Sequence, residues 1–350
     1  MTTNLHSNLN SLAIVILNWN GKKYLEQFLP SVIDNANGAS VIVADNASTD
    51  ESVSFVKENF PFVTIIQNEQ NGGFAKGYND ALKQVEAEFY LLLNSDIEVT
   101  SHWLAPLMDV MKDETVAGCQ PKILSYSNRN QFEHAGASGG FLDRNYYPFC
   151  RGRIVDKFEN DEGQYDNITE VFWATGAALL IRSELFHEAG GFDESFFAHM
   201  EEIDLCWRIK KLGYRFLVVP ESVIYHVGGG TLPYLSPKKS YLNFRNSLFM
   251  IVKNHDGFLF FKLFYRLTLD GIAGVRFFLR GEWQHLFSVL KAHFSMYTHL
   301  PYLLRQRRNI AENSRKFNAI GLYQGSILWA RYFKGITRFR DLNQRLFNSK

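Results

Sequence analysis

Carboxylates in two separate parts of the chain are the side chains best suited to metal binding and proton transfer. Asp96 closes the sequence Asn94-Ser95-Asp96, directly after the apolar run FYLLLN at residues 89–94. A carboxylate at the end of a buried strand is well placed to hold a hard divalent cation, which also needs diphosphate oxygens. A turn or a helix cap would explain Asp96 equally well. Taken alone, this sequence leaves both interpretations open.

The second group, Glu201-Glu202-Ile203-Asp204, places three carboxylates within four residues. On a helix, Glu201 and Asp204 share a face, and Glu202 points elsewhere. A solvated first turn would explain these residues, because the helix dipole favours acidic side chains there. The flanking sequence is apolar, however. Burial would raise the pKa of a carboxyl group and suit it to proton abstraction.

Three further sequences contain candidate ligands. His226 ends an apolar run and precedes residues 228–231 (GGGT), so it is a candidate metal ligand, although a lone histidine is more often structural. Asp45 begins residues 45–50 (DNASTD) and can accept from a base N–H or a ribose hydroxyl; a turn with a helix cap is the alternative. The stretch NGGFAKG at 71–77 enters a helix, where backbone N–H groups can face anionic groups, but alone it is a turn signal.

The elements that position these residues follow from the apolar pattern. Continuous apolar runs predict buried strands at residues 12–17, 40–45, 62–67 and 89–94. Helices are expected between and after them, at residues 22–35, 50–59, 75–87 and 102–112, with N-caps at Asp50 and Ser101. Such repetition builds a parallel, Rossmann-like α/β sheet that binds ligands beyond its carboxyl strand ends. Polar residues fall at those ends: Asn18, Asp45, 68–73 and 94–96.

The second half of the chain divides near residue 240. Residues 121–170 have a loop-rich composition, and the following block predicts a strand, a helix, a helix from near Met200, and two more strands. From 241 onward the pattern is helical, and 14 of the residues 241–300 are Phe, Tyr or Trp. Residues 1–240 have a net charge of −12, whereas residues 241–350 have one of +13. This asymmetry predicts two regions with different roles.

The basic C-terminal region has two interpretations. Residues 242–263 and 277–294 combine Phe, Leu and Trp with Lys and Arg, which is the composition of helices that lie in a membrane interface. A charge of +13 suits the anionic cytoplasmic leaflet. Alternatively, the aromatic residues pack onto the rest of the protein and the basic residues are solvated.

Several classes of protein are disfavoured. The three cysteines are widely spaced and odd in number, which favours a reducing compartment. The first residues lack the pattern of a signal peptide, and no run of 18 apolar residues predicts a spanning helix. No RRM, zinc-finger or helix-turn-helix pattern accompanies the basic region, so nucleic acid is not an expected partner. No GxGxxG follows the first strand, which disfavours a dehydrogenase. We expect a cytoplasmic protein, peripheral on the inner face of the plasma membrane.

Six sequences, taken in order, resemble those of family 2 inverting glycosyltransferases of the GT-A fold, in particular the bacterial rhamnosyltransferase-like branch. They are AIVILNWNG, VADNASTDES, NGGFAKGYNDAL, LLLNSDIEV, ATGAALLIRSELFHEAGGFDESFFAHMEEIDLCWRIKKLGY and YHVGGGT. The resemblance covers about residues 10–255. It implies a GT-A catalytic domain at 1–240, with a nucleotide-binding half at 10–120 and an acceptor-binding half at 121–240. A helical membrane-surface region is expected at 241–350.

The resemblance also implies binding roles. Residues expected at the nucleotide-sugar donor are Asn18, Asn20, Asp45, Gly72, Gly73, Lys76, Asn79, Asn94, Asp96 and Gly176. Among them, Asn18 and Asn20 lie near the base and ribose, Asp45 bonds the pyrimidine, and residues 72–79 lie against the diphosphate. Residues 173–177 line the pocket, and the residues expected at the acceptor are Trp173, Thr175 and Asp204.

The metal and the base follow from the same resemblance. Asp96 matches the last acid of the family's DxD motif, whose first position is Asn94 here. Mg²⁺ or Mn²⁺ is therefore expected on Asp96, with help from His226. Glu201-Glu202 matches a Glu-Asp motif whose second acid is the catalytic base. Because Glu202 stands where the family usually has Asp, either Glu202 or Glu201 takes the proton.

The implied reaction transfers a sugar from a nucleotide diphosphate to a hydroxyl of a lipid-linked or polysaccharide acceptor, as in O-antigen or capsule synthesis. Family analogy favours dTDP-L-rhamnose as the donor, and a UDP-hexose or UDP-N-acetylhexosamine is the alternative. A non-catalytic sugar-nucleotide-binding scaffold at the membrane is the alternative from another class. The linkage and the oligomeric state are not fixed by the sequence.

Overall fold

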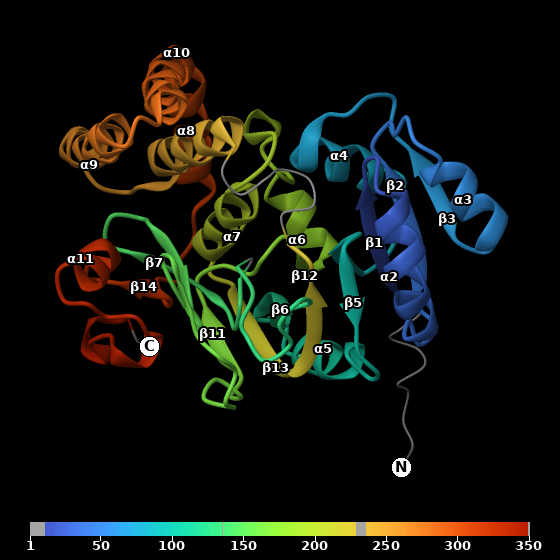
Figure 1. The fold of residues 1–350 in the computed structure, drawn as a ribbon. Coiled ribbons are helices and arrows are strands. Elements are labelled where there is room, and N and C mark those ends of the chain that lie inside the picture. The colour runs from blue at the N-terminus through green and yellow to red at the C-terminus, as the bar shows by residue number, and fades with distance from the viewer. Residues whose placement is uncertain (1–10, 135, 229–235, 349–350) are drawn as a thin grey trace.

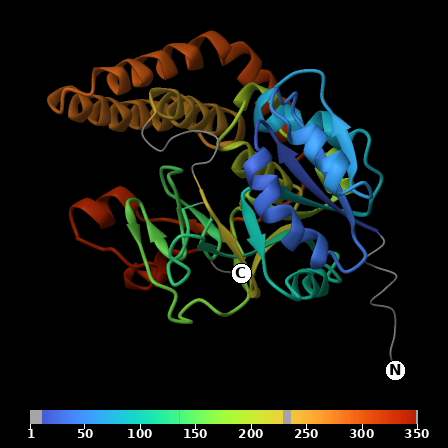
Figure 2. The same ribbon diagram turned by 45° about the vertical axis from the view of Figure 1, so that its right-hand side comes forward.

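The computed structural model describes residues 11–134, 136–228 and 236–348. Two sheets and a group of C-terminal helices make up the fold (Figures 1 and 2). The large sheet has the strand order β11-β13-β6-β12-β4-β1-β2-β3, and β5 pairs with β13. Its strands are β1 (Leu12–Asn18), β2 (Ser40–Asp45), β3 (Thr64–Gln67), β4 (Phe89–Asn94), β5 (Ile97–Val99), β6 (Val116–Ser125), β11 (Thr169–Val171), β12 (Ala178–Arg182) and β13 (Arg215–His226).

The N-terminal half of the large sheet is the predicted α/β unit. Strand β1 is parallel to both β2 and β4, and β2 is parallel to β3. The register pairs Asn18 with Asp45 and Leu17 with Asn94, so the polar strand ends meet at one edge. The helices of this half are α2 (Lys22–Asp34), α3 (Ser52–Asn59), α4 (Gly73–Leu82) and α5 (Leu104–Val110). The four predicted strands and helices are therefore confirmed.

The predicted helix starts are less accurate. Asp50 Oδ1 accepts from the Ser52 backbone N–H at 3.1 Å, so Asp50 does serve the first turn of α3. Helix α5, however, begins at Leu104, and Ser101 lies in the turn that precedes it rather than at its N-cap.

Residues 121–170 are not mainly loops. They complete β6 and form four strands of a second sheet, β7 (Gly140–Asp143), β8 (Pro148–Cys150), β9 (Arg153–Ile154) and β10 (Lys157–Phe158). These strands have two to four residues, too short for a period of two to be visible in the sequence. The two strands predicted after residue 214 are one strand, β13, whose register shifts between Val219 and Val223 around Pro220.

Helices predominate after residue 182. They are α6 (Ser183–Glu188), α7 (Glu201–Lys211), α8 (Pro237–Asn254), α9 (Leu259–Leu279), α10 (Trp283–Asn313) and α11 (Ile327–Tyr332). The expectation of a helical region from 241 onward is right as far as Asn313. Beyond it the chain returns to the second sheet, where strand β14 (Leu322–Tyr323) lies parallel to β7 (Figure 1).

Helix α8 is a core element, because its second half, from Asn246 to Asn254, is buried. Helices α9 and α10 contact each other and run outward as a pair of long helices (Figure 2). Among the described residues, no helix combines the length and the apolar character needed to cross a membrane.

The turn before α4 supplies a test of this architecture. Gly73 has a φ of +80°, and a Cβ there would lie 2.4 Å from the Phe197 carbonyl oxygen. Gly38 has a φ of +88°, but its Cβ would have no described atom within 4 Å. Alanine at either position costs roughly 1–2 kcal/mol for the left-handed backbone. Since Gly73→Ala adds a backbone clash, we expect it to lower the Tm at least about 2 °C more than Gly38→Ala. Equal Tm values in calorimetry would contradict this packing.

Candidate active site

The carboxyl edge of the parallel strands holds an ordered polar network. Asn18 Nδ2 donates to Asp45 Oδ1 and to Ser48 Oγ, both at 3.2 Å. Asn20 Oδ1 accepts from the Thr49 backbone N–H at 2.7 Å, which holds the loop after β2 against the end of β1. Asn18 Oδ1 is buried and has no hydrogen-bond partner among the described residues. This edge thus combines a buried carboxylate with an unused amide oxygen.

The glycine-rich turn lies beside this edge. Asn46 Nδ2 donates to Asn71 Oδ1 and to the Gly73 carbonyl oxygen, both at 3.0 Å, so β2 holds the turn before α4. A Cβ at Gly72 would meet the side chain of Lys76, which forms an ion pair with Asp80 at 2.7 Å. Lys76 is therefore near the turn, and its charge is already paired.

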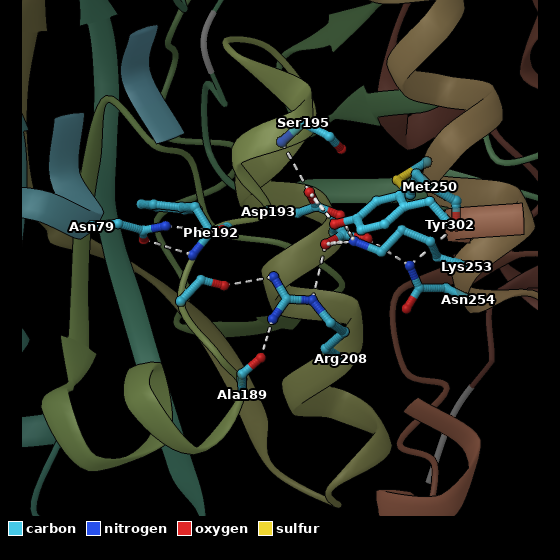
Figure 3. A network of polar contacts seen from close by, with 12 residues as sticks. Asn79, Ala189, Phe192, Asp193, Ser195, Arg208, Met250, Lys253, Asn254 and Tyr302 are labelled. Carbon is cyan, nitrogen blue, oxygen red and sulfur yellow. Dashed lines mark hydrogen bonds and ion pairs between the residues drawn. The ribbon is translucent and has the colours of Figure 1, made fainter. Parts of the chain in front are cut away.

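Asn79 is used differently from the other residues expected at the donor. Its Nδ2 donates to the Phe192 carbonyl oxygen at 2.8 Å, and its Oδ1 accepts from the Phe192 N–H at 3.0 Å. Both polar groups thus hold the loop between α6 and α7, which is a structural role (Figure 3).

Asp96 and His226 come together through the pairing of β5 with β13, which places His226 opposite Ile97. His226 Nε2 lies 3.1 Å from Asp96 Oδ1 and 3.4 Å from Asn94 Nδ2, and its Nδ1 lies 3.1 Å from Glu133 Oε2. Burial lowers the pKa of His226, but Asp96 and Glu133 more than reverse this effect and raise it to about 10. Residues 229–231, expected beside His226, lie outside the described residues.

The donor atoms of this group fit a divalent cation that is shared with a substrate. Within the described parts of the chain, no group of three His, Cys, Asp or Glu residues has the geometry to hold a metal ion. A carboxylate and an imidazole that has given up its proton nevertheless suit Mg²⁺ or Mn²⁺, which commonly take one or two protein ligands and complete their shell with water and phosphate oxygens. Glu133, on the far side of the imidazole, is placed to orient His226.

The candidate bases lie at the start of α7. Glu201 is buried and Glu202 partly buried, and Oε2 of each has no hydrogen-bond partner among the described residues. Burial raises the pKa of Glu202 to about 7. Burial raises the pKa of Glu201 well above its usual value, and the neighbouring charges of Glu202 and Asp204 add to this effect. Within the described part of the chain, neither carboxyl group forms an ion pair with Lys, Arg or His.

Residues 176–177 connect the two acidic groups. A Cβ at Gly176 would lie 3.6 Å from Glu202 Cβ and 3.0 Å from Phe74 Cζ, so the absence of a side chain leaves space beside the base. The Ala177 carbonyl accepts from the Asn94 N–H at 2.9 Å. Neighbouring residues of one stretch of backbone thus contact Glu202 on one side and the Asn94–Asp96 loop on the other.

The three residues expected at the acceptor have structural contacts instead. Asp204 is fully buried and binds Arg208, Lys253 and Asn254 through its two oxygens, within the polar network that joins α7 to α8 (Figure 3). Trp173 is buried and donates from Nε1 to the Phe141 carbonyl at 3.1 Å. Thr175 is buried, and its Oγ1 accepts from the Ala177 N–H. All three side chains are buried and have hydrogen-bond partners within the protein.

Sequence reasoning missed Glu133 and Asn246. Glu133 comes from the stretch expected to be loops, and a single acidic residue there is not a recognisable pattern. Asn246 is fully buried on α8 and contacts the turn before Glu201. Asn246 stands between Arg245 and Ser247, before the apolar run LFMIV, so no local pattern distinguishes it from a solvated polar residue.

Known proteins share both the sequence and the fold. Residues 13–182 match the sequence profile of the family described as Glycosyl transferase family 2. The N-acetylglucosaminyl-diphospho-decaprenol L-rhamnosyltransferase of Mycobacterium tuberculosis is 24% identical over 239 residues, which cover 61% of this chain and 75% of the relative.

Two solved structures are similar. GalNAc-T7 with UDP, GalNAc and Mn²⁺ gives a TM-score of 0.52 at 19% identity over 71% of this chain and 48% of its own. The mannosyltransferase PcManGT from Pyrobaculum calidifontis, in complex with GDP-Man and Mn²⁺, gives 0.50 at 15% over 87% and 85%.

The mixed, mostly parallel sheet with acidic side chains at its carboxyl edge is the GT-A architecture of glycosyltransferases. The profile match over residues 13–182, the mycobacterial relative and the fold together support a glycosyltransferase of family 2.

Proposed function

We propose that this chain transfers a sugar, with inversion, from a nucleotide diphosphate donor to an acceptor hydroxyl, and that Glu202 is the base. One observation carries the proposal: a partly buried carboxyl group with a raised pKa and an unpartnered oxygen lies beside Gly176, next to the loop that bears Asp96. A base with a pKa near the working pH transfers protons most effectively.

The reaction is a single displacement. Glu202 removes the proton from the acceptor hydroxyl, and the resulting oxygen bonds to the anomeric carbon on the face opposite the diphosphate. The bond from that carbon to the diphosphate oxygen breaks at the same time, and Glu202 keeps the proton. Asn18 and Asp45 hold the nucleobase and the ribose of the donor at the carboxyl edge of the sheet. Asp96 and His226 would hold Mg²⁺ or Mn²⁺, which supplies positive charge for the leaving diphosphate.

The two glutamates have different roles in this proposal. Glu201 is the more deeply buried of the two, and burial together with the neighbouring charge of Glu202 raises its pKa, which disfavours its ionised form. A neutral Glu201 leaves Glu202 as the carboxyl group that ionises near pH 7. The proton is therefore assigned to Glu202.

The substrates are proposed from the relatives. The mycobacterial relative is named for L-rhamnosyl transfer to N-acetylglucosaminyl-diphospho-decaprenol. This supports dTDP-L-rhamnose as the donor and a lipid-linked glycan as the acceptor, with UDP-hexose or UDP-N-acetylhexosamine as the alternative donors. A screen of nucleotide sugars by thermal shift identifies the donor, because a ligand of the native state raises its apparent stability. Turnover of that donor then excludes a non-catalytic scaffold.

A membrane surface is proposed as the place of action, on the face that α9 and α10 turn outward. The exposed apolar residues of α10 recur at helical spacing: Trp283, Phe287, Leu290, Phe294 and Tyr297. Those of α9 do the same: Phe261, Phe264, Tyr265, Ile272, Val275 and Leu279. Each set forms one stripe along its helix. The expected segment at 242–263 is different in its first part, because Leu242 and residues 246–254 are buried.

An anionic lipid surface is the occupant that suits these stripes. Arg276, Arg280 and Lys291 are exposed on the same two helices, and residues 241–350 have a net charge of +13. Apolar side chains flanked by cations bind the headgroup region of anionic bilayers. A second copy of the chain would instead bring like charges together. Attachment at the cytoplasmic leaflet is consistent with a lipid-linked acceptor.

Glu202→Gln tests the base. The amide cannot take a proton, so kcat should fall at least about a hundredfold, and Glu201→Gln should cost less. In the parent protein, kcat should rise with pH and level off above about 7, because Glu202 must be ionised. Near-normal turnover by Glu202→Gln would remove Glu202 from this role.

Asp96→Ala tests the metal site. Loss of this carboxylate should weaken Mn²⁺ binding in calorimetry by at least about tenfold and lower activity, because even the loss of an outer-shell partner costs that much. Glu98→Ala is the matched control, since Glu98 lies two residues away and pairs with Arg129 at the surface. Full activity in the presence of a chelator would contradict metal dependence.

Phe287→Ser combined with Phe294→Ser tests the membrane face. The side chains of Phe287 and Phe294 are 63% and 69% exposed on α10, and that of Phe62, in the catalytic half, is 70% exposed. In flotation with phosphatidylglycerol vesicles at low salt, we expect the parent and Phe62→Ser to bind and the double variant to lose at least about 90% of binding. Absence of binding by the folded, active parent would refute the proposal.

A further inference from the structure

The backbone immediately before the catalytic helix is held in an unfavourable conformation. Phe197, His199 and Met200 have φ values of 64°, 72° and 73°, although none of them is glycine. Residues with a Cβ disfavour this region, and they keep it only where the surroundings impose it. Met200 is the N-cap of α7, so the direction in which Glu201 and Glu202 leave the turn depends on these residues. We call residues 196–200 the entry turn.

One buried side chain from α8 binds most of the entry turn. Asn246 is fully buried, and its Nδ2 lies 3.0, 2.8 and 2.7 Å from the carbonyl oxygens of Phe196, Ala198 and His199. A side-chain amide has two N–H donors, so three carbonyls share them. A regular turn does not direct three backbone carbonyl oxygens at one side-chain nitrogen. Asn246 therefore compensates the backbone conformation of the entry turn.

Arg245 fixes the orientation of that amide. Its Nε donates to Asn246 Oδ1 at 2.8 Å, which leaves Nδ2 directed at the entry turn. Its Nη2 donates to the carbonyl oxygens of Ser195 and Phe196, both at 2.8 Å. The two neighbouring residues of α8 thus bind four backbone carbonyl groups of one loop, those of Ser195, Phe196, Ala198 and His199.

The entry turn also contacts the turn before α4. The Phe197 carbonyl accepts from the Phe74 N–H at 2.7 Å and from the Ala75 N–H at 3.3 Å. These are first-turn N–H groups of α4, whose glycine turn is expected against the diphosphate. The entry turn therefore joins the proposed donor turn on one side to the proposed base on the other.

We propose that Asn246, oriented by Arg245, is a positioning residue: by binding the entry turn it sets the location of Glu202 relative to the donor turn. This inference rests on the proposed function for its catalytic consequence. It assigns to α8, which lies beyond the matched residues 13–182, a part in the geometry of the reaction.

Asn254 provides the matched control. It is also a fully buried asparagine of α8, and its Nδ2 donates to Asp204 Oδ1 at 2.7 Å rather than to the entry turn. Asn254→Ala therefore removes a buried amide and a contact between α8 and α7, and it leaves the entry turn with its partners. A difference between the two variants reports on the entry turn rather than on the general packing of α8.

The kinetic experiment compares Asn246→Ala with Asn254→Ala in the full chain. The Tm of both variants is measured, so that kcat is compared between folded proteins. We expect kcat to fall at least about tenfold in Asn246→Ala and less than about threefold in Asn254→Ala. The pH at which kcat is half-maximal should also fall in Asn246→Ala, because a displaced Glu202 gains solvent and its pKa moves toward the ordinary glutamate value. Equal kcat values and equal pH profiles in the two variants would overturn the proposal.

A second measurement separates this proposal from the proposed function. Hydrogen exchange of the Phe74 and Ala75 amides requires no substrate, and these amides depend on the Phe197 carbonyl. Their exchange should accelerate at least about tenfold in Asn246→Ala and stay unchanged in Asn254→Ala. If the parent transfers no sugar but this acceleration occurs, the proposed function fails and the positioning of the two turns stands. Unchanged exchange in Asn246→Ala refutes the positioning role whatever the activity.

Discussion

The carboxylate of Asp204 has no exposed surface, and a buried charge is stable only where cations and donors surround it. Arg208 supplies one partner from α7 itself, and Lys253 and Asn254 supply the others from α8. Lys253 also contacts Asp193; burial would raise the pKa of Asp193, but Lys253 holds it well below its usual range. Helix α7 must therefore pack against α8, and the direction in which Glu201 and Glu202 leave its first turn is set by the residues that precede it.

The catalytic unit consequently extends beyond the part of the chain that matches the family. Residues 13–182 contain the parallel strands, the glycine turn and Asp96. The proposed base, His226 and the whole of α8 come later in the chain. Two long-range pairings join the parts: β13 with β5, which places His226 opposite Ile97, and the Phe74 N–H with the Phe197 carbonyl. Residues 13–182 contain Asp96, and the later part contains His226, Glu201 and Glu202, so neither part has the complete candidate site.

The sequence predicted the strands correctly where a local apolar pattern follows from the position of the strand in the sheet. Residues 12–17, 41–44 and 89–93 are apolar throughout because both faces of a parallel sheet are covered, and the polar residues that follow them, Asn18, Asp45 and Asn94, meet at one edge. Sequence reasoning failed where partners are distant or elements short. Strand β14 pairs with a strand almost 180 residues earlier, and Glu133 and Asn246 act through contacts that leave no spacing in the sequence. The resemblance placed Asp204 at the acceptor, whereas its burial depends on contacts with α8 that the sequence does not reveal.

The C-terminal helices have one side that packs against the rest of the protein and another that exposes apolar residues. Helix α10 buries Val289, Ala292 and Met296 against its neighbours, and Tyr302 of the same helix donates to Asp193 Oδ1 at 3.0 Å. The opposite side of α10 has the exposed aromatic stripe. A helix that contacts the Asp193–Lys253–Asp204 network on one side and the proposed lipid surface on the other has a fixed orientation relative to α7. Since α8 also binds the entry turn, the same helical region that would bring the protein to a lipid-linked acceptor would also position the proposed base.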